Sequence, residues 1–517
     1  MIVIGLENEF TAWSRSPKEL VKPYFPKNPA WNRYHLNLFP SYEEQPDEWI
    51  AAGRGSSSFW LSNGGRVYVD RQAYEYATPE CETLKNLVLA DKAGDIIQTN
   101  LFNGANDDPR RIFLMKRSAG TIFTGASLSY GDQQHASDQT WGSHENYLVS
   151  ERLFRKITEP LEGKPFPAAI LFALHLASRQ VYTGAGHLQI SGAPHGSSLV
   201  FWISPRAAFI TQFSCTSTVS NRPLINTRND HHAIGTWSGA RRLHVIVGDM
   251  NRSDWSVYLK FGTTLAVLLA LEFSTERETT SFLRGIDADN IDVLELLRRG
   301  STPFKGNAER DAFSKLLDIQ KRIIDFILPK KDFITGQFPE FEEVLASWQE
   351  ALDSAATTSG VFTRKLDWMI KRRLFEEASG MSIGDLMKID STDAMRRLAK
   401  LDFAYHRIHH GDLYEDLLEH HLAESLYSER DASWLVASPP PGRASRRTHL
   451  AHYLIEKRLT KCILCFDWSY VRLEDPRPLK IEDKETIVQR VSREILFDDT
   501  PLDVLKSKVA EITGTSL

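Results

Sequence analysis

The first ten residues, MIVIGLENEF, are the feature that most constrains how this chain can fold. Apolar Ile4 and Leu6 alternate with side chains of the opposite face, and this period of two is typical of a β-strand. Residues two apart in a strand project from the same face, so Glu7 and Glu9 point the same way from an otherwise apolar segment. The pair fits the solvated face of an edge strand. It fits equally well two hard oxygen ligands in a cleft that holds Mg²⁺ with nucleotide phosphates.

Strand and helix patterns follow one another along the rest of the chain. Strand-like segments recur up to about residue 250, whereas apolar residues at three- and four-residue spacing predict helices from about 257 to 425. This order predicts an α+β fold, in which helices flank a mainly antiparallel sheet.

A proline run at 439–441 interrupts the helical region. After it we expect a small unit with one helix, a strand from Cys462 to Arg472 and a terminal helix from about Lys484. The predicted organisation is a large catalytic domain at 1–430 and a small C-terminal α/β domain at 431–517.

Composition excludes several classes of protein. The chain has 62 basic and 67 acidic residues, a formal net charge of −5, so no global positive field attracts nucleic acid. Its four cysteines are too few for a disulfide framework. The N-terminus lacks a signal-peptide pattern, and the apolar run Leu265–Leu271 is far shorter than the ~20 residues of a membrane span. We therefore expect a cytoplasmic protein with no nucleic-acid or membrane partner.

Further ionisable side chains occur in pairs with the two-residue spacing of a strand face. These pairs are Tyr68 with Asp70, His144 with Asn146, and Arg242 with His244. Asp70 could act as a general base or could cap the turn that follows, and a single histidine on a strand is more often a core residue than a ligand. Their recurrence on separate strands of one predicted sheet indicates a trough that binds phosphate and metal.

Common nucleotide and hydrolase motifs are absent from the sequence. It has no G-x-x-x-x-G-K-[ST] loop, no G-x-G-x-x-G after a strand and no G-x-S-x-G elbow. Any ATP chemistry is therefore not of the P-loop kind.

Nine segments, distributed over nearly the whole chain, resemble in their order the motifs of one known family. They are G-L-E-N-E-F (5–10), N-G-G-R-V-Y-V-D (63–70), E-Y-A-T-P-E-C (75–81), G-S-H-E-N-Y-L (142–148), R-P-L-I-N-T-R (222–228), R-R-L-H-V-I-V-G-D-M-N (241–251), L-D-W-M-I-K-R-R-L-F (366–375), L-D-F-A-Y-H (401–406) and D-W-S-Y-V-R-L (467–473). In this order they resemble the family of the Pup ligase (proteasome accessory factor A) and the Pup deamidase/depupylase.

The resemblance implies a glutamine-synthetase-like fold, whose curved antiparallel sheet binds ATP and Mg²⁺. The family's ligase phosphorylates the terminal γ-carboxylate of the modifier Pup, and a lysine amine then attacks. By motif, the metal ligands would be Glu7, Glu9, Glu75, His144 and His244. The cofactor-binding residues would be Tyr68, Asn146, Arg228, Arg242 and Trp468, and Asp70 would be the catalytic aspartate.

Three functions remain open at this point: two reaction types and a non-catalytic role. The Phe10 to Asn63 gap is about the ligase's size, and segment 366–375 is nearer the ligase pattern, whereas the Asp70 to Glu75 spacing matches the depupylase. We favour an ATP-dependent carboxylate–amine ligase. A depupylase-type hydrolase and a non-catalytic nucleotide-binding paralogue are the alternatives.

The segments expected at the rim depart from the family pattern. N-T-R-D-E-P-H-A-D is N-T-R-N-D-H-H-A-I at 226–234, and the polar loop at 118–141 is longer and lacks the family's N-N-x-D stretch. These changes favour a divergent paralogue with a covered site. Its substrates would be Pup, a Pup-like modifier or a small carboxylate, and its acceptor a small amine or a protein lysine.

Overall fold

The structure is a computed structural model. It describes residues 2–14, 58–70, 73–103, 112–118, 140–161, 163–193, 196–218, 221–228, 239–389, 391–474, 492–497 and 500–515. The predicted rim segments 229–234 and 119–139 lie outside these residues.

The N-terminal strand lies inside a central sheet with the strand order β13-β6-β1-β4-β3-β2. These strands are β1 (Ile4–Ser14), β2 (Ser58–Trp60), β3 (Arg66–Asp70), β4 (Ala73–Ala77), β6 (Ser143–Ser150) and β13 (Ala240–Val245). All neighbours pair antiparallel, and β5 (Ile112–Met115) joins the second half of β1 to the short β14 (Arg407–Ile408). Because β1 pairs on both sides, the edge-strand interpretation of Glu7 and Glu9 is wrong.

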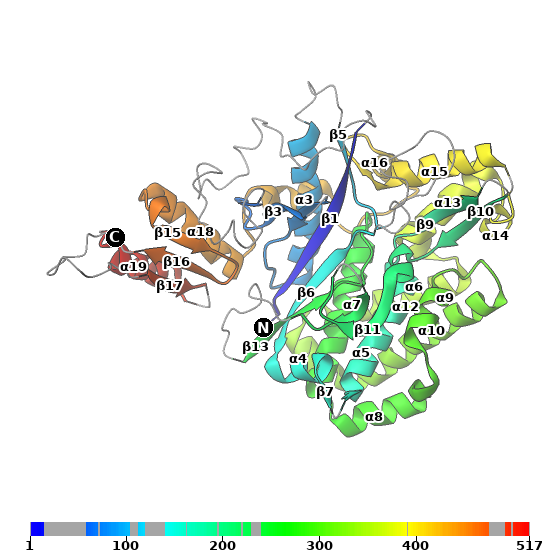
Figure 1. Ribbon diagram of the computed structural model, residues 1–517, viewed down its shortest axis with the longest axis horizontal. Coiled ribbons are helices and arrows are strands. Elements are labelled where there is room, and N and C mark those ends of the chain that lie inside the picture. Colours follow the sequence, from blue (N-terminus) through cyan, green and yellow to red (C-terminus); the bar gives the residue numbers. More distant parts are fainter. Residues whose placement is uncertain are drawn as a thin grey trace.

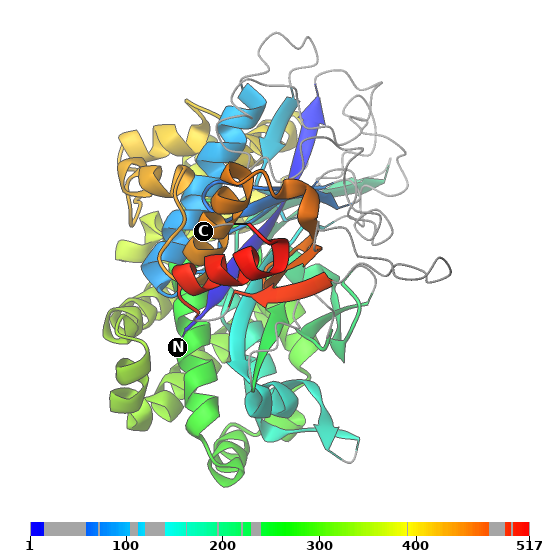
Figure 2. The ribbon, with the colours of Figure 1, turned by 90° about the vertical axis from the view of Figure 1, so that its left-hand side faces the viewer.

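Helices pack on one side of this sheet, as Figures 1 and 2 show from two directions. They are α3 (Leu84–Asn103), α4 (Glu151–Thr158), α5 (Pro167–Ser178), α6 (Gln180–Thr183), α7 (Asp254–Phe273), α8 (Glu276–Gly285), α9 (Val293–Gly300), α10 (Asn307–Ile327), α11 (Lys331–Gln337), α12 (Phe341–Thr357), α13 (Asp367–Ser379), α14 (Ile383–Leu386), α15 (Thr392–His406), α16 (Leu413–Glu419) and α17 (Glu429–Ala432). Together with the sheet they confirm the predicted α+β class.

Helix α7 is apolar around most of its circumference, which is typical of a helix at the centre of a core. It packs against α3, α5 and α12, and its residues belong to the largest hydrophobic cluster. Among the described helices it alone has the length and hydropathy of a membrane span, and 83% of that apolar window is buried inside the protein.

Two short strands pair outside the central sheet in parallel, unlike the rest. They are β11 (Ile210–Cys215) and β12 (Arg222–Asn226). The hairpin of β9 (His187–Ala193) and β10 (Gly196–Trp202) is antiparallel. The description of the sheets as mainly antiparallel therefore holds, with one exception next to β13.

The C-terminal residues form a separate small sheet, at the left of Figure 1. It contains β15 (Ile463–Phe466), β16 (Tyr470–Glu474) and β17 (Ser492–Leu496), with α18 (Arg443–Glu456) and α19 (Leu502–Thr513) packed around its own hydrophobic cluster. The predicted single strand from Cys462 to Arg472 is wrong, because a tight turn at Asp467–Ser469 divides it into a hairpin. The terminal helix begins at Leu502, later than predicted. The exact domain boundary at 430/431 stays a prediction.

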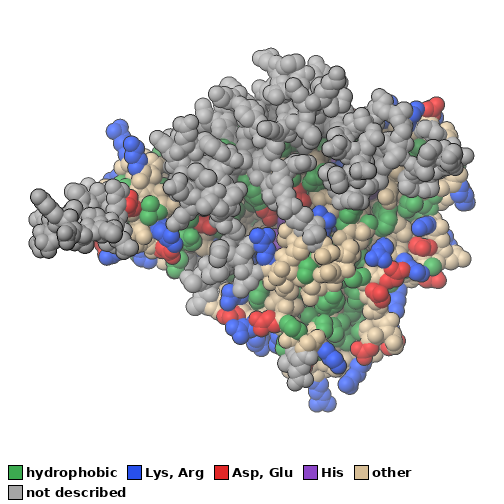
Figure 3. All heavy atoms as spheres, in the orientation of Figure 1, with side chains coloured by type: hydrophobic (Ala, Val, Ile, Leu, Met, Phe, Trp, Pro, Cys, Tyr) green, Lys and Arg blue, Asp and Glu red, His purple; other side chains and the backbone are tan. Residues whose placement is uncertain are grey.

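Charges of both signs are mixed on the described surface. Figure 3 shows acidic and basic side chains interspersed over the helical part of one face. Several of them pair one helical turn apart, for example Arg299 Nε with Glu295 Oε1 at 2.6 Å. Exposed pairs of this kind add little to stability, so packing of the helix layer determines the fold.

Candidate active site

One face of the central sheet gathers the ionisable side chains that the sequence singled out. Glu9 lies opposite Glu75, and Glu75 lies opposite Tyr68. Across the other edge of β1, Glu7 lies opposite His144. Farther along the same pair of strands, Asn146 lies opposite His244. Opposed residues share a face of a sheet, and we call the resulting set the trough face: Glu7, Glu9, Tyr68, Glu75, His144, Asn146, Arg242 and His244.

The acidic end of the trough face is arranged around His144. Its Nδ1 lies 3.5 Å from Glu7 Oε2, and its Nε2 lies 3.7 Å from Glu9 Oε1. Both glutamate side chains keep 19% of their surface exposed, whereas Glu75 is buried. Nε2 of His144 is buried and makes no hydrogen bond within the described residues. This end therefore presents oxygen atoms and one imidazole nitrogen to a ligand.

The basic end is held by a hydrogen-bonded trio on β6 and β13. Arg242 Nη1 donates to Asn146 Oδ1 at 2.7 Å and lies 3.1 Å from His244 Nδ1. The same Oδ1 lies 3.1 Å from His244 Nδ1. The rings of His144 and His244 meet edge to face, 5.3 Å apart, which joins the two ends of the trough face.

Burial and neighbouring charge set the protonation of two groups. Burial by itself raises the pKa of Glu7, but its hydrogen bond with His144 and the charges of His144 and Arg242 outweigh burial and hold that pKa below its usual range. For His244, burial and then the charges of Arg242 and other neighbours lower the pKa well below its ordinary value. At neutral pH the site thus contains an ionised Glu7 and a neutral His244, and neutral imidazole is the form that can bind a metal.

Arg206 joins this site, although no motif or spacing in the sequence indicated it. It lies on a single 3₁₀ turn, Pro205–Phe209, where its Nε donates to Ile246 O at 2.7 Å and its Nη1 to Thr140 Oγ1 at 3.2 Å. A Cβ on Gly142 would lie 2.7 Å from Arg206 Nη2 and 2.5 Å from His144 Nε2, so only glycine fits there. Burial lowers the pKa of Arg206 to about 10, and the charge of Glu9 opposes that shift. Arg206 therefore adds a positive charge beside the acidic end.

Two predicted site residues lie at the margin. Arg228 follows β12, is exposed, and contributes to the positive field that lowers the pKa of His244. Asp70 ends β3, two residues on from Tyr68, and pairs with Ala73 through its backbone; its side chain lies outside the described part of the chain.

The ends of the predicted long loop meet beside the trough face. Trp141 N donates to Ser118 O at 3.1 Å, and Thr140 Oγ1 donates to the same oxygen at 2.6 Å. Gly142 and His144 follow directly. The described residues on either side of segment 119–139 therefore lie next to the acidic end, and the role of that segment stays a prediction.

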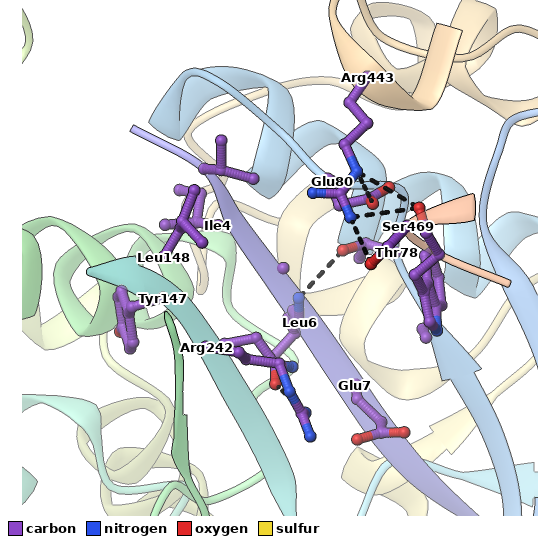
Figure 4. Close-up of a pocket in the computed structure, with 15 residues that line it drawn as sticks. Ile4, Leu6, Glu7, Thr78, Glu80, Tyr147, Leu148, Arg242, Arg443 and Ser469 are labelled. Carbon is purple, nitrogen blue, oxygen red and sulfur yellow. Dashed lines mark hydrogen bonds and ion pairs between the residues drawn. The ribbon is translucent and has the colours of Figure 1, made fainter. Parts of the chain in front are cut away.

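A pocket extends from the trough face along β1 to the C-terminal sheet. Its lining consists of Val3, Ile4, Gly5, Leu6, Glu7, Ala77, Thr78, Glu80, Asn146, Tyr147, Leu148, Arg242, Arg443, Trp468 and Ser469. Figure 4 shows Glu80, Arg443 and Ser469 together at one end and Glu7 and Arg242 toward the other, with Ile4 and Leu148 to the side. The pocket brings the predicted Trp468 into one cavity with Asn146, Arg242 and Glu7, whereas Glu80 and Arg443 were missed.

The described residues do not contain a group of three or more His, Cys, Asp or Glu side chains close enough to hold a metal by themselves. The carboxylates of Glu7 and Glu9 lie on either side of the His144 ring, at 3.5 Å from its Nδ1 and 3.7 Å from its Nε2. Mg²⁺ commonly takes only one or two protein carboxylates and completes its shell with water and substrate phosphates. The donor set therefore fits a metal that arrives with a nucleotide.

Comparison with known proteins finds relatives over most of the chain. A family model described as Pup-ligase protein matches residues 12–472. A Pup–protein ligase of Kineococcus radiotolerans is 31% identical over 491 residues, covering 92% of this chain and 93% of that protein. A Pup–protein ligase of Micrococcus luteus is 31% identical over 493 residues, covering 92% of each.

Two solved structures have the same fold. A complex between Pup and its ligase PafA has a TM-score of 0.64 at 22% identity and covers 99% of this chain and 93% of that one. PafA in complex with ADP has a TM-score of 0.62 at 23% identity, with 96% and 99% covered. At these identities the likeness concerns the arrangement of helices and strands.

Proposed function

Because the chain belongs to the Pup-ligase protein family, we propose that it is an ATP-dependent ligase that joins the γ-carboxyl group of Pup, or of a Pup-like modifier, to an amine. The observation that supports this most is the trough face, where carboxylates, histidines and an arginine from four strands converge next to a pocket. The Pup–protein ligase names of the relatives support the reaction type, and the ADP complex of PafA supports the nucleotide. The cytoplasmic location stays a prediction.

The nucleotide would lie along β1. Trp468 beside Ser469, and Ile4 and Leu148 at the side, give the pocket apolar lining suited to a nucleobase, whereas Arg242 and Glu7 lie toward the other end. Phosphates at the polar end would meet Arg242 directly and Arg228 and Arg206 from the side. Asn146 and Tyr68 complete the expected contacts on the trough face.

Mg²⁺ would be held by Glu7, Glu9 and Glu75, with His144 and His244 beside them. When bound, it would neutralise phosphate charge and orient the γ-phosphate. The fit rests on hard carboxylate oxygens, on the unpartnered Nε2 of His144 and on the neutral state of His244.

The residues of the chain account for each chemical step. A carboxylate oxygen of the modifier attacks the γ-phosphorus, the bond to the β–γ bridging oxygen breaks, and ADP leaves. Arg242 and Arg206 offset the charge on the transferring group. The amine then attacks the acyl phosphate carbon, inorganic phosphate leaves, and Asp70 accepts the proton that the amine releases.

A direct assay separates the ligase from its alternatives. The protein is incubated with ATP, Mg²⁺ and Glu-terminated Pup, together with a lysine-bearing protein or a panel of free amino acids and amines. We expect ADP, phosphate and a conjugate in equal amounts. Cleavage of a Pup conjugate without ADP release would identify a hydrolase, and absence of both reactions with retained ATP binding would identify a non-catalytic paralogue.

Asp70→Asn tests the assigned base within the same assay. Loss of a general base typically lowers rates by about 10²–10⁴-fold, and we expect that loss with unchanged Mg-ATP affinity by calorimetry. Asp318→Asn, on the exposed face of α10, is the matched control and should keep full turnover. Full turnover in Asp70→Asn would return Asp70 to a capping role.

A further inference from the structure

The turn that carries Trp468 is fixed from within. Asp467 N donates to Tyr470 O at 2.9 Å, which closes the hairpin between β15 and β16. Trp468 N donates to Asp467 Oδ1 at 2.8 Å. Trp468 and Ser469 both line the pocket, although they belong to the C-terminal sheet. The position of this turn therefore decides the shape of one end of the pocket.

Two arginines of α18 donate hydrogen bonds to the same turn. Arg443 donates to Trp468 O from Nε and Nη2 at 3.3 and 3.2 Å, and Arg447 Nη1 donates to it at 3.0 Å. Arg443 Nη2 also donates to Ser469 Oγ at 3.1 Å. The two arginines are four residues apart and so project from one face of the helix. One carbonyl oxygen thus receives three N–H groups.

Glu80, which follows β4 of the central sheet, holds both arginines. Its carboxylate lies 2.7 Å from Arg447 Nη2 and 3.3 Å from Arg443 Nε. Burial raises the pKa of Glu80, but the charges of Arg447 and Arg443 outweigh burial and hold that pKa below its usual range. Glu80 therefore stays ionised at neutral pH. Figure 4 shows it between Arg443 and Ser469 at the edge of the pocket.

Arg447 also packs against two aromatic rings, those of Trp60 and Trp468. Its guanidinium carbon lies 4.8 Å from the ring centres of both Trp60 and Trp468, and those two rings meet edge to face at 4.7 Å. Its Nη2 donates to Gly64 O at 2.8 Å, in the turn before β3. Arg447 is 1% exposed, so its guanidinium group is shielded from solvent.

We propose that Glu80, Arg443 and Arg447, which we call the latch residues, position Trp468 and Ser469 and thereby set the affinity of the pocket for the nucleobase. The latch residues are positioning residues, because they reach the nucleotide only through the turn. This inference rests on the proposed nucleotide site. A purely structural role would instead change stability without distinguishing the base from the phosphates.

Two probes with the same phosphates and Mg²⁺ distinguish these roles. ATP contacts both ends of the pocket, whereas inorganic tripolyphosphate can contact only the Glu7 and Arg242 end. Glu80→Gln removes the charge that holds both arginines and keeps the side-chain shape. Arg443→Lys keeps a positive charge near Glu80 and removes the planar fork that holds Trp468 O. Arg447 is avoided because its truncation would uncover a buried carboxylate and endanger the fold.

We expect both variants to bind Mg-ATP roughly tenfold more weakly by calorimetry, as befits the loss of charged hydrogen bonds, and to bind Mg-tripolyphosphate like the wild type. Nucleotide-induced change in tryptophan fluorescence should shrink in parallel. Glu494→Gln is the matched control: it removes the exposed Arg472–Glu494 pair (2.7 Å) of the same small sheet and should leave both affinities unchanged.

The outcomes distinguish a failure of the latch proposal from a failure of the proposed nucleotide site. If the wild type binds neither probe, the proposed function and the latch both fail. If the wild type prefers ATP and both variants keep that preference, the latch alone fails. Equal weakening of ATP and tripolyphosphate, or loss of the folded state in both variants by thermal melting, would assign the cluster to stability and overturn the positioning role.

Discussion

Strand β6 separates two environments that treat charge in opposite ways. Glu145 faces the helices, where it is fully buried and pairs with Arg179 Nη1 at 2.7 Å. Tyr147 donates to the same carboxylate at 2.6 Å. Its sequence neighbour His144 faces the trough, where its Nε2 has no hydrogen-bond partner within the described residues. The nearest carboxylates to His144 are 3.5 and 3.7 Å away.

The two sides differ in which groups lie next to the buried or half-buried charges. On the helix side, the charges of Glu145 and Arg179 pair with each other, and Arg179 Nη1 also donates to Thr264 Oγ1, at 2.6 Å. On the trough side, the carboxylates of Glu7 and Glu9 lie 3.5 and 3.7 Å from His144, and both side chains keep 19% of their surface exposed. Ionisable side chains that gather beside a pocket are typical of a ligand-binding site. The helix side should thus determine stability, and the trough side activity.

The largest effect should follow from breaking the buried ion pair of Arg179 and Glu145, which we call the closed pair. Arg179→Met leaves Glu145 buried without its partner, and such a loss costs about 3–5 kcal/mol. We expect the free energy of unfolding in urea to fall by that amount. Arg179→Lys is the matched control, because it keeps the charge and should recover part of the loss. A fall of less than about 1 kcal/mol, the level of a surface pair, would contradict the closed-pair interpretation.

Glu9→Gln should do the reverse: it should lower Mg-ATP affinity and leave stability nearly unchanged. It removes one of several carboxylates on the trough face, so stability should change by less than about 1 kcal/mol or even rise. Because the charge is needed only with Mg²⁺ and nucleotide, Mg-ATP affinity should fall at least 10–100-fold. Calorimetry with and without Mg²⁺ separates the metal-dependent part. Undiminished Mg-ATP affinity would remove Glu9 from the proposed metal ligands.

Local spacing predicted which described side chains share a face of the central sheet, whereas their roles stay predictions. The two-residue alternation assigns Glu7 and Glu9, Tyr68 and Asp70, and Arg242 and His244 to strand faces, since side-chain direction in a strand depends only on position. The resemblance to the family added the prediction that these strands belong to one sheet that binds ATP and Mg²⁺. The α+β class follows from the same patterns.

Features set by distant contacts were not predictable in this way. The turn at Asp467–Ser469 interrupts an apolar run without any glycine or proline, so the hairpin was read as one strand. Arg206 lies on a single 3₁₀ turn whose sequence resembles any surface turn, and only its contacts with Thr140 and Ile246 bring it to the site. Glu80 meets Arg443 across more than 300 residues of sequence, which no local pattern encodes.

The smallest predicted effect is a pH dependence on the helix side, at His175. This histidine is fully buried on α5, next to the closed pair, and its Nε2 lies 3.1 Å from Thr264 Oγ1. Burial, and then the charge of Arg179, lowers its pKa well below the ordinary 6.5. The folded protein therefore keeps His175 neutral where the unfolded chain takes up a proton.

The sign of the effect follows from that difference in bound protons. Below pH 6.5 the unfolded state binds one more proton at this position, so protonation favours unfolding, and the stability present above pH 6.5 is lost as the pH falls. For one such histidine the loss between pH 7.5 and 5.5 is about 1.4 kcal/mol. His175→Gln can still bond to Thr264 and cannot titrate, so its free energy of unfolding should fall by about that much less over the same interval. Asp95, whose pKa is raised to about 6 by burial, works in the opposite direction and is present in both proteins, so the difference between the two urea series isolates His175. Equal pH dependence in wild type and variant would mean that His175 is protonated in the folded state, and that the helix side is less closed to charge than its contacts with Arg179 and Thr264 indicate.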